Sequence, residues 1–194
     1  MQWKEGYPLD FKEALRTPSE ADIARLLSKS NQAPRFVYGA LMLPTVLKYF
    51  LSVPQYAKVN MVPATLRGFK LYKIAERGLP AIMRSEDETS EVHGMLIFGL
   101  DSEQRNSIFE VESGGGLTKF TDVQVQIHQK DVIGRYQVKD ARTVDAGTFV
   151  WSASPEALTV GEASCWDLCD FLAGQLYENI VQIQNRSQDL DELD

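Results

Sequence analysis

The sequence has few of the residues on which several common chemistries depend. Its 194 residues include two cysteines and two histidines, and none of these occurs in the spacing of a zinc site. The Gly-x-Ser-x-Gly motif of α/β-type serine hydrolases is missing. There is no run of lysine and arginine of the kind that binds nucleic acid, and no stretch approaches the ~20 apolar residues of a membrane-spanning helix. These absences favour a small-molecule partner over nucleic acid or a membrane.

The amino-terminus also lacks the features of a secretion signal. Residues 1–6 have no basic start followed by an apolar run. The balance of 20 basic and 27 acidic residues gives a net charge of −7, which disfavours contact with anionic membranes. Cys165 and Cys169 lie four residues apart on a predicted helix, where a disulfide is unfavourable, and we expect packed thiols there. We therefore expect a cytoplasmic protein.

The positive signals are those of one compact domain. With 44% hydrophobic residues, the chain can fill a core of its own. β-branched and aromatic enrichment predicts strands at 35–39, 62–67, 69–75, 80–84, 91–99, 120–128 and 144–151. Apolar spacing predicts helices at 44–52, 101–109 and 164–184. Strands with few helices between them indicate an α+β fold. We expect a helical extension over 1–33, a domain over 34–184 and a flexible acidic tail over 185–194.

One strand ends in a turn suited to binding an anion. The segment Phe36–Met42 reads Phe-Val-Tyr-Gly-Ala-Leu-Met, a short apolar strand that stops at Gly39. Backbone N–H groups at such a turn are free to receive a carboxylate or phosphate. The predicted binding residues are Tyr38, Gly39, Ala40, Leu41 and Met42. Strand pleating alone leaves open whether Tyr38 points into a pocket or into the core.

Further motifs follow this turn in a recognisable order. They are Leu-Arg-Gly-Phe at 66–69, Leu-Pro-Ala-Ile at 79–82, Val-His-Gly-Met-Leu at 92–96, Phe-Glu at 109–110 and Phe-Val-Trp at 149–151. Over residues 34–180 this order and spacing resemble the gamma-glutamylcyclotransferase-like family, in particular its AIG2-like branch. The resemblance implies a small mixed β-barrel with flanking helices. It also implies a cofactor-independent enzyme without a metal, which cyclises a γ-glutamyl group to 5-oxoproline and releases an amine or a peptide.

Glu110 is the predicted catalytic base. Its neighbours Ile108, Phe109 and Val111 are apolar, and a carboxylate among apolar groups loses hydration, so its pKa should rise. A surface glutamate that points to water is the alternative. The family has its catalytic carboxylate in a Phe-Glu pair, so the resemblance favours catalysis by Glu110.

The chain also departs from the family pattern. Ala40 replaces the usual hydroxyl residue of the turn, and Asn106 and Ser107 replace a leucine and an aspartate that often precede the Phe-Glu pair. A tyrosine and an arginine that commonly follow align best with Phe120 and Asp122. Between them lies a loop with three consecutive glycines, 114–116, which resists ordering and could act as a flap.

These departures shape the expected substrate. Phe120 suits an apolar substrate group, so we expect a bulky leaving group such as a glutathione conjugate. Fungal relatives credited with trimming such adducts in sulfur-containing toxin pathways keep that class open. A γ-glutamylamine or glutathione-specific cyclotransferase is one alternative, and a binding module without turnover is another. Arg77 is either a partner for a substrate carboxylate or a solvated turn residue.

Overall fold

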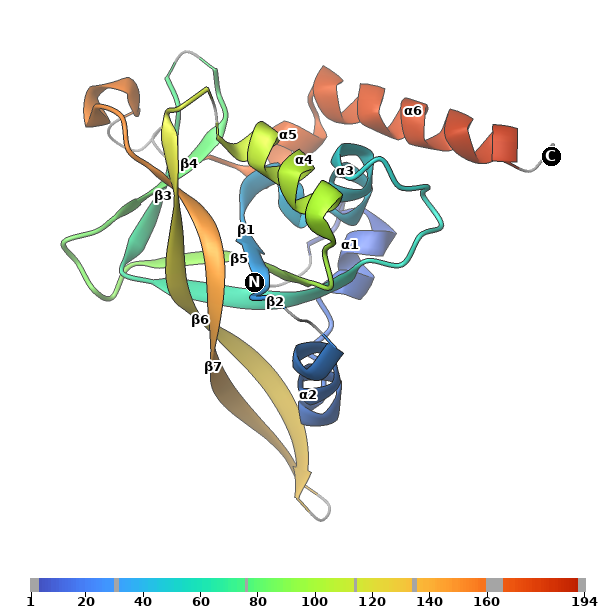
Figure 1. Ribbon diagram of the computed structural model, residues 1–194, viewed down its shortest axis with the longest axis vertical. Coiled ribbons are helices and arrows are strands. Elements are labelled where there is room, and N and C mark those ends of the chain that lie inside the picture. The colour runs from blue at the N-terminus through green and yellow to red at the C-terminus, as the bar shows by residue number, and fades with distance from the viewer. Residues whose placement is uncertain are drawn as a thin grey trace.

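The computed structural model describes residues 4–29, 32–75, 77–113, 115–133, 136–159 and 166–191 (Figure 1). The strands are β1 (Arg35–Val37), β2 (Asn60–Arg67), β3 (Phe69–Lys73), β4 (Pro80–Arg84), β5 (Glu91–Phe98), β6 (Thr118–Ile133) and β7 (Tyr136–Trp151). The helices are α1 (Leu9–Ala14), α2 (Glu20–Lys29), α3 (Pro44–Phe50), α4 (Ser102–Glu112), α5 (Leu168–Leu172) and α6 (Gln175–Asp191). Two short 3-10 turns are η1 (Gly39–Met42) and η2 (Pro155–Ala157).

Five strands close into a barrel in the order β1-β5-β2-β6-β7. Neighbouring strands are antiparallel except at the closing seam, where β1 meets β7 in parallel at Arg35 and Gly147. β3 and β4 form a separate two-stranded sheet. The predicted α+β fold with a small mixed barrel and flanking helices is confirmed.

The last two barrel strands extend far beyond their predicted ends. β6 and β7 pair continuously from Thr118 and Trp151 to Ile133 and Tyr136, and Figure 1 shows the far half as a hairpin that projects from the barrel. The predicted segments 120–128 and 144–151 cover only the barrel half. Beyond them the sequence is rich in charged residues and no longer alternates, so the backbone ladder continues without an apolar pattern.

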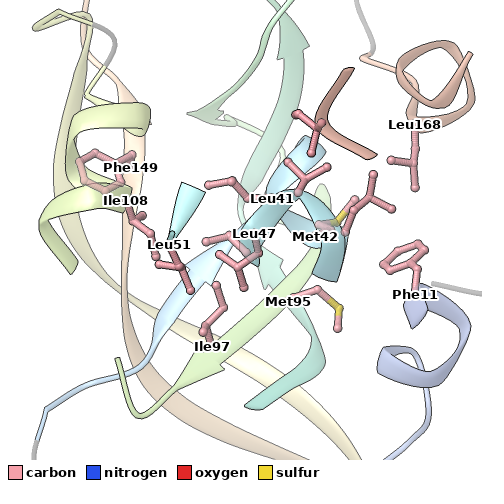
Figure 2. Packing of buried hydrophobic residues seen from close by; sticks show 14 of the residues in the cluster. Phe11, Leu41, Met42, Leu47, Leu51, Met95, Ile97, Ile108, Phe149 and Leu168 are labelled. Atoms are coloured by element: carbon pink, nitrogen blue, oxygen red, sulfur yellow. The ribbon is translucent and has the colours of Figure 1, made fainter. Parts of the chain in front are cut away.

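The core combines residues from both ends of the chain. Figure 2 shows Phe11 of α1, Met42 of η1 and Met95 of β5 in one apolar cluster, which also includes Ile108 of α4 and Leu168 of α5. The Phe11 side chain is 0% exposed. Asp10 beside it accepts a hydrogen bond of 2.7 Å from the Thr45 hydroxyl of α3. Helix α1, which the sequence did not predict, is therefore anchored to the barrel by both apolar and polar contacts.

Helix α2 completes a second part of the core. Ile23 and Leu26 are buried in the cluster that contains Leu66 of β2 and Val125 of β6. Both helices of the predicted extension thus contribute buried side chains. The division of the chain after residue 33 stays a sequence prediction, although these contacts join the extension to the barrel core.

The carboxyl-terminal helix differs from its prediction. The expected helix over 164–184 is two helices, α5 and α6, separated at Ala173 and Gly174, because glycine is a poor helix former. α6 then continues to Asp191, well into the acidic segment expected to be a flexible tail. Cys169 is exposed rather than packed, and Cys165 lies outside the described residues. Among the helices that the structure describes, none is long and apolar enough to cross a bilayer.

Candidate active site

Helix α4 runs further than predicted, and this changes which carboxylate faces the barrel. A capping box starts the helix, in which the Asp101 side chain accepts from the Gln104 backbone and the Gln104 side chain accepts from the Asp101 backbone. The helix then continues to Glu112. Glu110 is exposed, so the prediction that it lies among apolar groups is wrong. Since α4 continues past Glu110, that side chain is turned to solvent.

Glu112 occupies the inward face of the same helix. Arg105, Ile108 and Glu112 follow each other at intervals of three and four residues, and Ile108 is 1% exposed. Glu112 is half-buried, and its loss of hydration raises the pKa of the carboxyl group to about 7. The Thr118 hydroxyl donates a hydrogen bond of 2.6 Å to the Glu112 carbonyl oxygen. This bond fixes the end of α4 against the start of β6.

The Tyr-Gly turn lies beside this carboxyl group. Tyr38 is 2% exposed, and its hydroxyl donates a hydrogen bond of 2.9 Å to the carbonyl of Phe149 in β7. Burial, and next the negative charge of Glu112, raise the pKa of Tyr38 well above its usual value. Tyr38 therefore stays neutral, links β1 to β7 and lies close enough to Glu112 to respond to its charge. Tyr38 is both a core residue and part of the wall of a cavity.

Gly39 has two reasons to be glycine. Its φ angle is +64°, a conformation that side-chain-bearing residues adopt at a cost. A Cβ atom there would also overlap the ring of Pro80 at the start of β4. The close packing of Gly39 on Pro80 places η1 directly against the β3–β4 hairpin. At the amino end of such a turn the first N–H groups have no partner within the helix.

The carboxyl group and the turn share one cavity of about 120 Å³. Its walls are Tyr38, Ala40, Leu41, Phe50, Ile74, Arg77, Leu79, Pro80, Val111, Glu112, Leu117, Thr118, Trp151, Phe171, Leu176 and Ile180. Figure 1 shows β4, α4 and α5 at the same end of the barrel, where these residues meet. A mostly apolar cavity with one titratable carboxyl group is suited to proton transfer away from bulk water.

Only some of the predicted binding residues line the cavity. Tyr38, Ala40 and Leu41 line the cavity, whereas Gly39 and Met42 are buried and are not among its described lining residues. Phe120 also lies outside the cavity. Its ring packs edge-on against Phe149, and the Arg35 guanidinium lies 4.0 Å from its ring centroid. The predicted contact between Phe120 and an apolar substrate group therefore has no support in the cavity lining.

A larger groove lies elsewhere on the barrel. It measures about 720 Å³ and is lined by residues of β2, β3, β4, β6 and β7 that include Arg67, Arg84 and Asp122. It shares no lining residue with the smaller cavity. Arg67 there pairs with Glu91 at 3.1 Å, and the Arg84 guanidinium lies 5.5 Å from the Phe69 ring centroid. The described residues that line this groove include no buried acid or base, so the smaller cavity is the candidate active site. Within the described residues, no three His, Cys, Asp or Glu side chains are grouped to hold a metal ion.

Helical spacing could have identified Glu112 from the sequence. Asn106 stands four residues before Glu110, and Ile108 stands four residues before Glu112. Residues four apart share a helix face, so the glutamate that follows an apolar residue by one turn faces the core. A shift of the motif by two residues also places Ile108 where the family has leucine. The prediction of Glu110 did not take into account which residues of this helix share a face with the apolar Ile108.

Three comparisons place the chain among known proteins. The family model "Gamma-glutamyl cyclotransferase, AIG2-like" matches residues 35–168. AIG2-like protein B of Arabidopsis thaliana is 32% identical over 97 residues, which is half of this chain and half the length of that protein. Protein AIG2 A of the same plant is 28% identical over 73% of this chain and 72% of its own length. A solution structure from Arabidopsis thaliana covers 84% of this chain and 87% of its own, at 21% identity and a TM-score of 0.49.

The match to the family begins in the strand that leads into the Tyr-Gly turn and ends at the first residue of α5, so it includes both the turn and Glu112. From this match, which covers most of its length, the chain belongs to the gamma-glutamyl cyclotransferase, AIG2-like family.

Proposed function

We propose that this protein is a γ-glutamyl cyclotransferase in which Glu112 is the catalytic acid and base. One observation carries the proposal: a carboxyl group with a pKa of about 7 lines a mostly apolar cavity beside the turn that begins at Tyr38. A group whose pKa lies near the working pH can both accept and return a proton in one reaction cycle. Family membership supports the same class of reaction.

The proposed reaction needs one proton carrier. The Glu112 carboxylate takes a proton from the α-ammonium group of the substrate, and the freed amine attacks the γ-carbonyl carbon. As the bond from that carbon to the leaving nitrogen breaks, Glu112 returns the proton to the leaving nitrogen. The regenerated carboxylate then accepts the second proton, which the ring nitrogen loses on becoming the lactam N–H, and passes it to the released amine. The products are 5-oxoproline and an amine or peptide. Because the attack is intramolecular, most of the catalytic effect comes from orientation and from the placement of Glu112. The reaction is redox-neutral.

The turn at η1 is the proposed receptor for the γ-glutamyl group. Ala40 and Leu41 line the cavity wall, and the N–H groups at the start of the turn are the donors for the substrate carboxylate or the developing oxyanion. Ala40 has no hydroxyl group, so this receptor depends on the backbone alone. The rigid packing of Gly39 on Pro80 keeps that backbone in place.

The size of the cavity bears on the substrate. Its volume of about 120 Å³ is below the ~300 Å³ of a typical small-molecule pocket, so it suits the γ-glutamyl group and leaves the remainder outside. Leu79, Phe171 and Leu176 add apolar surface to the wall. We therefore retain glutathione conjugates, including those of fungal sulfur-containing toxin pathways, as substrates to test, with their apolar adduct outside the cavity.

The test is release of 5-oxoproline from a panel of γ-glutamyl compounds. The panel contains γ-glutamyl-alanine, γ-glutamylamines, glutathione and a glutathione S-conjugate. Glu112→Gln should lower kcat by about 10²- to 10⁴-fold, because an amide cannot carry the proton. Glu110→Gln is the matched control, since Glu110 is exposed on the other face of the same helix. Loss of activity in Glu110→Gln with full activity in Glu112→Gln would refute the assignment.

A binding module without turnover is the second candidate. It is favoured by the missing hydroxyl at Ala40 and by the positions of Phe120 and Asp122, where the family commonly has tyrosine and arginine. If the parent protein releases no 5-oxoproline from any member of the panel but binds γ-glutamyl compounds, this candidate gains.

A further inference from the structure

The cavity wall carries one cationic side chain, and it lies on the β3–β4 hairpin. Among the lining residues that the structure describes, Arg77 is the only lysine or arginine, and Glu112 is the only acid. Arg77 is exposed at the turn of the hairpin. The ion pairs that join described residues lie elsewhere, at Arg67–Glu91 and in α2. The guanidinium is thus available to an anion at the edge of the cavity.

The turn that carries Arg77 is held firmly by hydrogen bonds. Within the turn, Ile74 N–H donates to the Leu79 carbonyl and Gly78 N–H to the Ile74 carbonyl, each at 2.8 Å. Outside it, Ala75 N–H donates to the Ala157 carbonyl at 3.0 Å. These bonds join the hairpin to the segment after β7. The residues that flank Arg77 are therefore bonded to each other and to the segment after β7.

A second fixation comes from the strand that precedes the turn. The Lys73 carbonyl accepts hydrogen bonds from both the N–H (2.9 Å) and the hydroxyl (2.8 Å) of Thr159. On the other side, Pro80 packs on Gly39 of the η1 turn. The hairpin is thus in contact both with the proposed receptor for the γ-glutamyl group and with the segment after β7.

The charges of Glu112 and Arg77 indicate which substrate group Arg77 can bind. A negatively charged Glu112 repels a second carboxylate on the substrate, and no other cation of the described wall offsets that repulsion. The small cavity leaves the leaving group at its exposed edge, where Arg77 lies. Guanidinium and carboxylate groups form paired hydrogen bonds of fixed geometry.

We propose that Arg77 is a specificity-determining residue that binds a carboxylate on the leaving group, so that γ-glutamyl-amino acids and γ-glutamyl-peptides are preferred over γ-glutamylamines without a carboxylate. The inference rests on the proposed function. It deepens that function by naming the class of leaving group.

Two matched substrates test the inference. γ-Glutamyl-alanine and γ-glutamyl-ethylamine differ only in the carboxylate of the leaving group. Arg77→Gln should raise KM for γ-glutamyl-alanine about tenfold and leave its kcat unchanged, because the lost contact is remote from the reacting atoms. The KM for γ-glutamyl-ethylamine should not change. Lys70→Gln, which removes an exposed cation from β3 of the same hairpin, should leave both substrates unaffected.

The outcomes separate this inference from the proposed function. Equal losses on both substrates, or no loss on either, would overturn the role of Arg77 while 5-oxoproline release upholds the function. If the parent protein turns over neither these two compounds nor any other member of the panel, the proposed function fails. Calorimetric binding of the two compounds to Glu112→Gln, with and without Arg77→Gln, then tests Arg77 without turnover. A preference for the alanine compound that disappears with Arg77→Gln supports the inference, and identical affinities overturn it.

Discussion

Glu112→Gln should change the pH dependence of stability as well as activity. The ordinary glutamate pKa of 4.5 applies to the unfolded chain, and the folded chain holds the pKa at about 7. Between these values the folded state binds a proton that the unfolded state has released. The stability contributed by the protonated group is therefore fully present below pH 4.5 and is lost as the pH rises to 7. Glutamine stays neutral and avoids this loss.

The size of the effect follows from the two pKa values. At about 1.4 kcal/mol per pH unit, the interval from 4.5 to about 7 corresponds to about 3 kcal/mol. Glu112→Gln should match the parent protein near pH 4 and exceed its free energy of unfolding by about 3 kcal/mol at pH 8. For a chain of this length that is a rise in Tm of about 6 to 12 °C.

Urea unfolding at pH 4.5, 6 and 8 measures the difference directly. The comparison between the two proteins removes the titration of carboxyl groups that they share. Glu110→Gln is the matched control, since it makes the same substitution at an exposed position of the same helix. A Glu112→Gln difference that does not grow between pH 4.5 and 8, or that reverses in sign, would refute the raised pKa and with it the argument for the base.

Three further substitutions test the frame around the site. Gly39→Ala should destabilise the protein by about 2 kcal/mol or more, since it combines a φ of +64° with overlap on Pro80, and an unchanged Tm would contradict the packing argument. Thr118→Val removes the hydrogen bond to the Glu112 carbonyl and should lower kcat and shift the pH profile of activity, whereas Thr118→Ser keeps the hydroxyl and should keep the parent kcat and pH profile. Equal effects of the two substitutions would show that the hydroxyl plays no part. Phe11→Ala should cost about 3 to 5 kcal/mol in urea unfolding because its ring is 0% exposed, and a loss below about 1 kcal/mol would mean that α1 is dispensable for the core.

The barrel could be predicted because its signals are local. Enrichment in β-branched and aromatic residues identified each barrel strand, and Gly39 marked the end of β1. The far half of β6 and β7 was missed because a projecting hairpin can be held by backbone pairing without an apolar pattern. Helix α1 was missed because a single buried side chain, Phe11, gives no period to detect.

By itself the sequence determined the barrel, the family and the turn at Tyr38, since β-branched and aromatic enrichment, short motifs and a glycine-ended strand are properties of neighbouring residues. The tertiary structure showed which of two neighbouring glutamates lines the cavity. Glu110 and Glu112 are two residues apart, and two steps of about 100° along a helix turn one to solvent and the other to the cavity. It also decided that Phe120 lies elsewhere and that Arg77 belongs to the cavity, because segments far apart in the chain meet there. Such contacts between distant segments depend on the packing of the whole domain.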